Sequence, residues 1–535
     1  MKNISFKYLI KLYVFPLAGA FLNQMGMPWK KLGRSKLGRE VLIAQVKKIK
    51  ETLVIEKQQQ PLNIYFLTML GGHTHNVSVD VVLGLGLKKK GHQVHFVLDD
   101  LCLPINEDRR NGQEANWDRI SAKGFHFGKR YLNAAGLDVL LLSELIDKRK
   151  EVDIAQFASI FEASLLKHYK VGVINEQLPR LAEKKKLIRQ SINYTTQLGN
   201  HILSLKPDRV IMSHGIYSTW GPPFEILNEA GIPILTYSKT KRKKTEKFNW
   251  NYTADWWDVS EEWVRVKDTP LTSEQEKKID EYLETRITHK DDVLVYNFGK
   301  LEAKTETLRR FKLNPDLPVF SLFTNVLWDA ASAQREIAFD NPVNWVYETI
   351  DWFIKNPHLQ LIVKIHPAEV VIGTNQPFAD LIKAKYPNLP PNICLIEPAE
   401  KVNSWSIYEV TDLGLVHTTT AGMEMPLVNV PCVVVSKTHY RDKGFTVDIQ
   451  SKEEYFSLLD SFKPGQFDMN QTSILAKRYA YLLFERYQMP FEVFDEIAWT
   501  DVRSLTFNTI DELFEKPYFD AIIDAIIEKG QFLTN

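Results

Sequence analysis

The sequence contains few cysteines and almost no net charge, and each shortage excludes a class of protein. Its 535 residues include three cysteines, Cys102, Cys394 and Cys432, which are far apart and match no zinc-binding spacing. Free thiols are typical of a reducing compartment, so we expect a cytoplasmic protein. The formal net charge is +1, from 67 basic and 66 acidic residues. A general nucleic-acid binder needs a basic surface, so we expect no nucleic-acid partner.

Long apolar runs are also scarce. Residues 4–22 are apolar and aromatic, but two lysines and a proline interrupt them. A membrane-spanning helix needs about 20 apolar residues, and a signal peptide has a cleaner apolar core. Two interpretations of residues 1–55 stay open. One is an amphipathic segment that lies on a membrane surface together with the basic stretch 30–39, and the other is a helix that packs on the protein itself.

A chain of this length exceeds the size of one hydrophobic core, so we expect two domains. Patterns typical of buried strands alternate with helical patterns in two separate series. The first series occupies residues 56–260 and predicts strands at 61–70, 93–98, 206–212 and 232–237. A glycine turn and a helical stretch join the first two strands, as in a βαβ unit.

A polar, tryptophan-rich stretch and a helical connector over 261–312 separate the two series. The second series occupies residues 313–465 and predicts strands at 318–323, 359–365, 392–396, 413–416 and 432–436. Helical patterns fill 466–535. The sequence therefore predicts an α/β protein with two tandem Rossmann-like domains facing a cleft, and with extra helices at the N-terminus, in the connector and at the C-terminus. Ligands of such sheets bind beyond the carboxyl ends of the strands.

Two strand ends of the second domain carry residues suited to a phosphate. The strand 359–365 ends in His366-Pro367, where proline stiffens the turn and directs the imidazole toward the cleft. The strand 413–416 is soon followed by Thr418, Thr419 and Thr420 at the start of a predicted helix. Hydroxyl residues there cap free N–H groups, and the same N–H groups bind phosphate. We favour phosphate binding for the whole cluster.

The stretch continues with Gly422, Glu424 and Pro426. Gly422 allows a ligand to approach the backbone closely. Glu424 lies in the first turns of the predicted helix, where a carboxylate accepts hydrogen bonds from a ribose diol or complements the helix dipole. Pro426 suits only the first turn of a helix. Either the helix begins later than Thr420, or it is kinked at Glu424.

Several of these segments together resemble a known family. The residues concerned are 366–369 (HPAE), 418–424 (TTTAGME), 430–435 (VPCVVV) and 438–446 (THYRDKGFT), with 323–329 (FTNVLWD) and 214–221 (HGIYSTWG) in support. Their order resembles the signature of the bacterial capsule polysaccharide biosynthesis family. That family is similar to capsule Kdo transferases and, more distantly, to other GT-B glycosyltransferases. The resemblance implies a GT-B-like fold.

The resemblance also implies roles for particular residues. His366 and the turn Thr418–Thr420 would hold the phosphate of a nucleotide-sugar donor, with Glu424 on the nucleotide side. Glu369, Arg441 and Lys443 would lie near the cleft, where the two basic residues suit a leaving phosphate; an exposed turn is the alternative for Lys443. The nucleotide sugar is a substrate, so no cofactor is expected. No predicted strand ends in the Asp-x-Asp motif of metal-dependent GT-A enzymes, so we expect no metal.

The first domain would bind the acceptor and supply a general base. Residues 71–76 (GGHTHN) follow the first strand, as glycine-rich acceptor loops do in GT-B enzymes, and they lack the Gly-Lys-Ser/Thr ending of a P-loop. Five side chains at strand ends are candidate bases: His73, His75, Asp99, Asp100 and His214. We favour His73 and His214, and a turn-capping or core histidine is the alternative for each.

The sequence thus predicts a metal-independent glycosyltransferase of capsule or surface polysaccharide biosynthesis, for hexosyl or Kdo-type transfer. Its expected partners are a nucleotide sugar, a glycan or lipid-linked glycan acceptor, the inner membrane surface and the capsule export machinery. Two alternative activities fit the same fold: polyol-phosphate transfer and nucleotide-sugar epimerisation. A non-catalytic component that binds polysaccharide for export is a third alternative.

Overall fold

The computed structural model describes residues 36–107, 109–257, 259–290, 292, 299–329, 335–498 and 501–534. These residues form two compact units. Unit 1 comprises the described residues up to Phe161, together with Ala182–Ala254 and Gln488–Thr534, and unit 2 comprises Glu162–Leu181 and Asp255–Tyr487. The described chain therefore passes repeatedly from one unit to the other.

Unit 1 is built around a seven-stranded sheet with the order β13-β6-β5-β4-β1-β2-β3. Strands β1 to β5 are parallel, whereas β6 and β13 are antiparallel to their neighbours. The chain moves outward from β1 to β3 and then returns to the other side of β1 with β4, as in Rossmann-like folds. The strands are β1 (Asn63–Leu67), β2 (Gln93–Leu98), β3 (Asp138–Leu141), β4 (Arg209–Met212), β5 (Ile234–Lys239), β6 (Thr245–Trp250) and β13 (Met489–Pro490).

Apolar clusters cover both faces of this sheet. Ile64 and Phe66 of β1 belong to one cluster, and Tyr65 and Leu67 belong to another. Alternate residues of a strand face opposite sides, so the central strands of such a sheet are apolar at successive positions. The N-terminal and central helices of unit 1 are α3 (Lys36–Glu51), α4 (Thr74–Lys89), η3 (Glu114–Asn116), α5 (Trp117–Ala134), α6 (Leu142–Leu145), η4 (Ala155–Phe157), α8 (Leu181–Ser204) and α9 (Tyr217–Glu229). Helix α7 (Ala158–Tyr169) begins in unit 1 and ends in unit 2.

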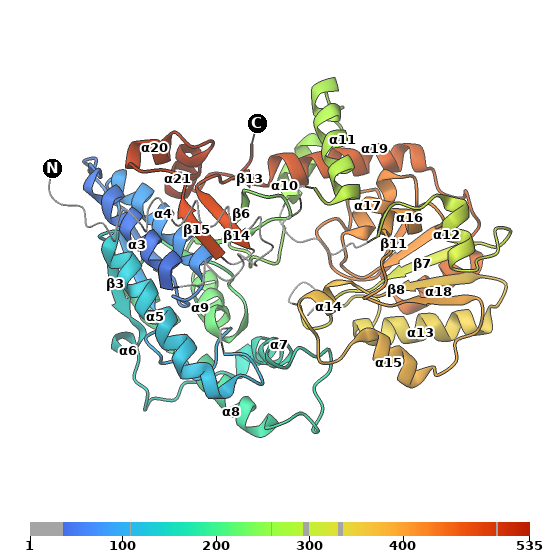
Figure 1. The fold of residues 1–535 in the computed structure, drawn as a ribbon, viewed down its shortest axis with the longest axis horizontal. Coiled ribbons are helices and arrows are strands. Elements are labelled where there is room, and N and C mark those ends of the chain that lie inside the picture. Colours follow the sequence, from blue (N-terminus) through green and yellow to red (C-terminus); the bar gives the residue numbers. More distant parts are fainter. Residues whose placement is uncertain are drawn as a thin grey trace. The chain divides into compact units, whose positions relative to one another are not determined.

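The C-terminal segment completes unit 1. It contributes β13, the antiparallel pair β14 (Phe494–Ala498) and β15 (Asp501–Leu505), and the helices α20 (Ile510–Phe514) and α21 (Phe519–Glu528). Helices α20 and α21 contact α4, and β15 contacts α3, so the red and blue ends of the colour scale lie side by side in Figure 1. A Cβ added at Gly86 of α4 would lie 2.6 Å from Ile523 of α21, so this glycine permits the close packing. The sequence predicted only helices here.

Unit 2 is built around a six-stranded parallel sheet with the order β12-β11-β10-β7-β8-β9. The chain moves outward from β7 through β8 to β9 and then returns to the other side of β7 with β10. The point where the chain changes direction therefore lies between β7 and β10. The strands are β7 (Val319–Phe323), β8 (Gln360–Lys364), β9 (Ile393–Ile396), β10 (Leu413–Val416), β11 (Cys432–Val434) and β12 (Val447–Asp448).

One main core cluster joins the unit 2 sheet to helix α13. Leu322 of β7 and Val363 of β8 lie in this cluster with Trp345 and Ile350 of α13. Asn341 begins α13 by accepting a hydrogen bond from Asn344 N at 2.9 Å, which caps the helix. The helices are α10 (Ser260–Val266), α11 (Ser273–Thr288), α12 (Lys304–Arg310), α13 (Pro342–Lys355), α14 (Ala368–Val371), α15 (Phe378–Lys385), α16 (Ser404–Tyr408), α17 (Ala421–Leu427), α18 (Lys452–Ser461), α19 (Met469–Tyr481) and η5 (Leu482–Arg486).

Residues 162–181 belong to unit 2, although they lie within the first series of strands in the sequence. Gln376 Oε1 accepts hydrogen bonds from Gly172 N at 2.9 Å and Val173 N at 3.0 Å. Asn375 N donates to Lys170 O at 2.9 Å. These bonds join residues about 200 positions apart, which no local pattern could predict.

The predicted α/β fold with two Rossmann-like domains is confirmed. Strands β2 and β10 have the predicted bounds. The sequence predicted neither the short strand β3 nor the mostly polar β6. The amphipathic segment predicted at residues 4–22 lies outside the described residues. None of the helices among the described residues combines the length and the apolar character that crossing a membrane requires.

Candidate functional site

The candidate site of unit 2 lies where β7 and β10 end. These neighbouring strands flank the point at which the chain changes direction, and Rossmann-like sheets bind their ligands there. Thr324 and Asn325 follow β7, and both are buried. The sequence singled out the residues after β8 and β10, which lie on either side of β7.

Two hydrogen bonds connect the predicted phosphate-binding residues to this point. Thr324 Oγ1 accepts from His366 N at 3.0 Å. Asn325 Oδ1 accepts from Thr418 N at 3.2 Å. The loop after β7 therefore brings together His366 and Thr418, two residues that the sequence analysis assigned to one site. The family resemblance includes Thr324 and Asn325 within residues 323–329 but assigns neither of them a role.

The position of the proton on His366 follows from one further contact. Ala368 N donates to His366 Nδ1 at 3.1 Å, so Nδ1 is an acceptor. In the neutral imidazole the other nitrogen, Nε2, then carries the proton. His366 is half-buried, and its Nε2–H is suited to donate a hydrogen bond to a phosphate oxygen.

The threonine turn does not cap the helix that follows it in the usual way. Thr420 occupies the N-cap position of α17, but its side chain makes no capping hydrogen bond. Thr418 Oγ1 is buried and has no hydrogen-bond partner among the described residues. Thr419 O accepts from Tyr440 OH at 2.6 Å. The side chains of Thr418 and Thr420 therefore do not cap helix α17.

The structure explains the glycine at position 422 by packing within the protein and not by the approach of a ligand. A Cβ added there would lie 2.5 Å from the Tyr440 hydroxyl oxygen, so the space beside this glycine belongs to Tyr440. Helix α17 begins at Ala421, directly after Thr420, and contains Pro426 in its last turn. The helix therefore does not begin later than expected, and it ends one residue after the proline.

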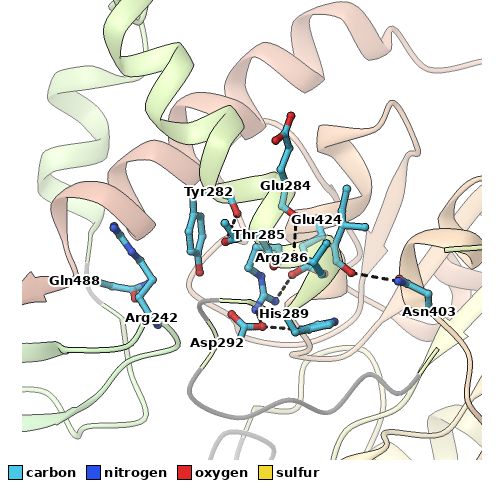
Figure 2. Close-up of polar contacts among 12 residues, drawn as sticks. Arg242, Tyr282, Glu284, Thr285, Arg286, His289, Asp292, Asn403, Glu424 and Gln488 are labelled. Carbon is cyan, nitrogen blue, oxygen red and sulfur yellow. Dashed lines mark hydrogen bonds and ion pairs between the residues drawn. The ribbon is translucent and has the colours of Figure 1, made fainter. Parts of the chain in front are cut away.

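Glu424 is the centre of a buried polar cluster in unit 2 (Figure 2). Glu424 Oε1 pairs with Arg286 Nη2 at 2.5 Å, and Oε2 accepts from Tyr408 OH at 2.9 Å. Arg286 Nη1 also pairs with Asp292 at 2.6 Å, and Asp292 contacts His289 Nδ1 at 2.7 Å. Both oxygens of Glu424 thus already hold protein partners. No sequence pattern indicated a role for Arg286, which lies in the predicted connector.

Glu369 lies three residues after His366, but its carboxylate stabilises the nearby backbone. It is 4% exposed, and its two carboxylate oxygens accept from Phe378 N at 3.3 and 3.2 Å. Burial raises the pKa of Glu369 to about 7. This side chain ties the short helix α14 to the start of α15.

Arg441 and Lys443 occupy different environments. Arg441 is 6% exposed and donates from Nη1 to Val434 O at 3.0 Å and from Nη2 to Ile449 O at 2.8 Å. The guanidinium group therefore stabilises the backbone of β11 and the residue that follows β12. Lys443 is half-exposed, and its Nζ contacts Ser260 Oγ at 3.2 Å.

Two lysines from residues 162–181 approach the loop after β7. Lys167 Nζ lies 4.6 Å and Lys170 Nζ 5.2 Å from the centre of the Trp328 ring. Trp328 is 5% exposed, and its Nε1 is buried without a hydrogen-bond partner among the described residues. The predictions missed this basic and aromatic group because its lysines come from a distant part of the chain.

His417, directly before the threonine turn, is a buried neutral histidine. It is 2% exposed, and burial together with the positive charge of Arg335 lowers its pKa to about 3. Its carbonyl accepts from Ser436 Oγ at 2.6 Å, which joins the ends of β10 and β11.

The favoured base candidates lie at the corresponding point of unit 1. His73 follows β1 and His214 follows β4, and β1 and β4 flank the reversal of that sheet. His73 is half-buried at the N-cap position of α4. His214 is also half-buried; its Nδ1 lies 2.7 Å from Ser213 Oγ, and its ring stacks on Trp220. The glycine turn beside His73 packs against α5, since a Cβ at Gly71 would lie 2.7 Å from Gly124 O.

The other candidate bases hold structural contacts. His75 is 2% exposed, and its Nε2 pairs with Glu246 at 2.7 Å. Asp99 accepts from Cys102 N at 2.7 Å and Leu103 N at 3.2 Å, and burial raises its pKa to about 6. Asp100 accepts from Ser143 N at 3.0 Å and from Ser143 Oγ. These two carboxylates and Cys102 are close enough to hold a metal ion, but their hydrogen bonds already account for the arrangement as a turn.

Comparisons with known proteins add a likeness of fold. No family model and no curated protein matches the chain. Among solved structures, the chain is similar to the β-Kdo 2,4-transferase KpsC of Thermosulfurimonas dismutans, with 16% identity and a TM-score of 0.35 over 60% of this chain and 87% of that one. It is also similar to UDP-GlcNAc 2-epimerase from Neisseria meningitidis bound to UDP-GlcNAc, with 12% identity and a TM-score of 0.26 over 78% and 98%. A third similar structure is MurG of Acinetobacter baumannii, with 13% identity and a TM-score of 0.26 over 78% and 94%. Likenesses this distant carry no conclusion about the reaction.

Proposed function

We propose that this chain is a GT-B-like glycosyltransferase of capsule or surface polysaccharide biosynthesis. It would transfer a sugar from a nucleotide-sugar donor to a glycan or a lipid-linked glycan. The observation that carries the proposal is the pair of hydrogen bonds by which Thr324 and Asn325 hold His366 and Thr418 beside the β7–β10 reversal. That position is where Rossmann-like sheets bind nucleotides.

The chemistry of the proposed site follows from the polar atoms it contains. His366 Nε2–H would donate to a phosphate oxygen of the donor, because Nδ1 already accepts from Ala368 N. The unpartnered Thr418 Oγ1 would donate a second hydrogen bond. Such bonds strengthen as negative charge builds up on the leaving nucleotide. In this proposal no metal or cofactor takes part, and His73 or His214 removes the proton of the acceptor hydroxyl.

Donor hydrolysis tests the proposal. The protein is mixed with CMP-, UDP-, GDP- and dTDP-sugars, and donor binding is followed by thermal shift and turnover by the release of free nucleotide. We expect one donor class to raise the unfolding temperature, since a bound ligand stabilises the folded state. The same donor should be slowly hydrolysed. His366→Ala should abolish the hydrolysis, whereas His358→Ala is the matched control because His358 is exposed in the turn before β8.

The panel separates the alternatives as well. Neither binding nor turnover of any donor would contradict the proposal. Conversion of the donor to its epimer would identify an epimerase, and transfer of an intact polyol phosphate would identify a polyol-phosphate transferase. Binding of a glycan without any nucleotide release would favour a non-catalytic export component.

We also propose that the residues before α3 hold the protein on the inner membrane surface, near the capsule export machinery. The support is the sequence pattern alone, in which the apolar and aromatic stretch 4–22 is followed by the basic stretch 30–39.

A further inference from the structure

Lys364 is a buried lysine that follows three apolar residues in a strand of unit 2. It is the last residue of β8 and follows Leu361, Ile362 and Val363. The side chain is 5% exposed. In the sequence, Lys364 stands out only as a single charge in the run LQLIVKI, two residues before His366.

The ammonium group of Lys364 lacks the partner that a buried lysine needs. Among the described residues, none forms a hydrogen bond or ion pair with its Nζ. Two other buried lysines have an acceptor close by: Lys184 Nζ lies 2.8 Å from Glu114 Oε1, and Lys247 Nζ donates to Ala254 O at 2.7 Å. Lysines are almost never fully buried unless paired.

The electrostatic surroundings agree with this lack of a partner. Burial lowers the pKa of Lys364 to about 8, and the attraction of Glu400 does not offset it. The group is therefore still mainly protonated at neutral pH and carries a charge that the fold does not neutralise. A buried charge of this kind costs stability.

Lys364 also lies next to the candidate donor site. Its carbonyl accepts from Thr324 N at 3.1 Å, and the hydroxyl of the same threonine accepts from His366 N. Leu361, Val363 and Ile365 belong to the main core cluster, whereas Ile362, which alternates with them, does not. Alternate residues of an extended chain share a face, so Lys364 and His366 lie on the face opposite those core residues.

We propose that Lys364 is an anion-binding residue of this site, whose ammonium group neutralises an oxyanion of the bound substrate. The oxyanion comes either from a diphosphate or from the carboxylate of an acidic sugar, and both present the same chemistry to the amine. The inference rests on the proposed function for the identity of the substrate, but it concerns anion binding alone. The stability that the buried charge costs in the free protein is recovered when the anion binds.

Lys364→Met tests the proposal, since methionine retains the length of the side chain without its charge. Unfolding temperatures are measured without ligand, with inorganic pyrophosphate and with glucuronate, at constant ionic strength. We expect Lys364→Met to unfold at a higher temperature than the wild type without ligand. The rise in unfolding temperature produced by the preferred anion should be lost in this variant. Lys355→Met is the control, because Lys355 is an exposed lysine at the end of α13.

A second measurement concerns protons. Binding of the anion should return the pKa of Lys364 toward its ordinary value, so calorimetry near pH 8 should show that the wild type takes up more protons on binding than Lys364→Met does. Which of the two anions gives the effect identifies its source.

The proposal is overturned if Lys364→Met unfolds at a lower temperature than the wild type, or if it binds both anions as the wild type does. These results are separate from those of the donor panel. Anion binding that depends on Lys364, without hydrolysis of any nucleotide sugar, would remove the proposed function and keep this inference. Donor turnover that is unchanged in Lys364→Met would support the proposed function and contradict this inference.

Discussion

Arg286 Nη2 lies 2.5 Å from Glu424 Oε1, and this ion pair joins the end of α11 to α17 across 138 positions of sequence. Both side chains are buried, and Tyr408 and Asp292 complete their hydrogen bonds. The pair anchors the predicted connector to the helix that begins directly after the threonine turn. Glu424 therefore has a structural role that the sequence did not suggest.

Removing one member of this pair should be costly. We expect Arg286→Met to lower the free energy of unfolding by about 3–5 kcal/mol, because it leaves the carboxylate of Glu424 buried without its cation. Urea unfolding measures the change. The double variant Arg286→Met with Glu424→Leu should lose less than the sum of the two single variants. Additive losses would show that the two side chains are not energetically coupled.

Glu424→Gln distinguishes the structural role from contact with the ribose. The amide keeps the shape of the side chain but removes the charge that Arg286 requires. We expect a loss of stability of about 1–3 kcal/mol, with donor affinity in the thermal-shift panel unchanged once the lower starting temperature is taken into account. A variant as stable as the wild type that no longer binds donor would restore the ribose interpretation.

Asp80 should make the stability of unit 1 depend on pH. It is 2% exposed, Tyr237 OH donates to it at 2.7 Å, and burial raises its pKa from 3.8 to about 7. The unfolded chain releases this proton at a lower pH than the folded chain does. The free energy of unfolding should therefore fall as pH rises between these two pKa values, by up to about 4 kcal/mol.

The test compares urea unfolding at about pH 5 and about pH 8. Asp80→Asn should remove this part of the pH dependence, and Asp316→Asn, which alters an exposed carboxylate, should not. If the wild type and Asp80→Asn depend on pH in the same way, the raised pKa of Asp80 is wrong.

Arg441 is expected to contribute to stability more than to donor binding. Its guanidinium donates to two buried backbone carbonyls, and hydrogen bonds from a charged group contribute about 1.5–3 kcal/mol each. Arg441→Met should therefore lower the free energy of unfolding by about 3 kcal/mol, whereas Lys443→Met should change it by less than about 0.5 kcal/mol. Loss of donor binding in a stable Arg441→Met variant would support the charge-partner role that the resemblance implied.

The N-terminal segment is tested by deleting residues 1–28. Helix α3 begins at Lys36 and packs Leu42 and Val46 into the core of unit 1, so the deletion removes none of the described residues. Full-length protein should sediment with vesicles that contain anionic lipid, and the shortened protein should stay in solution. Equal sedimentation, together with a lower unfolding temperature, would show instead that the segment packs on the protein.

The parts of the fold that the sequence predicted are those with a strong local signal. Strands β2 and β10 are mostly apolar runs with a glycine, aspartate or threonine within two residues of each end, and the order of such runs was enough to indicate two Rossmann-like units. Strand β6 was not predicted because it is mostly polar and antiparallel. Strand β3 was not predicted because its four residues lie between helical patterns.

The residues of the candidate site also divide into those with a local sequence signal and those without one. His366 and Thr418 could be found because each lies two residues after the end of a strand, and their partners Thr324 and Asn325 also follow a strand. Arg286 and the lysines of residues 162–181 could not be found, since only tertiary packing brings them to unit 2. The roles of Glu369 and Arg441 were likewise hidden, because a buried and an exposed polar side chain look alike in sequence.

The way in which the chain divides between the units has a consequence for biosynthesis. Residues 488–534 supply an edge strand of the unit 1 sheet and the helices that pack on α4. The described residues of unit 2 end at residue 487, whereas the core of unit 1 stays open until residues 488–534 have been synthesised and have packed on α4. A chain that emerges from the ribosome would therefore expose the apolar residues of α4 until that segment follows, and this interval is when the protein would depend most on chaperones.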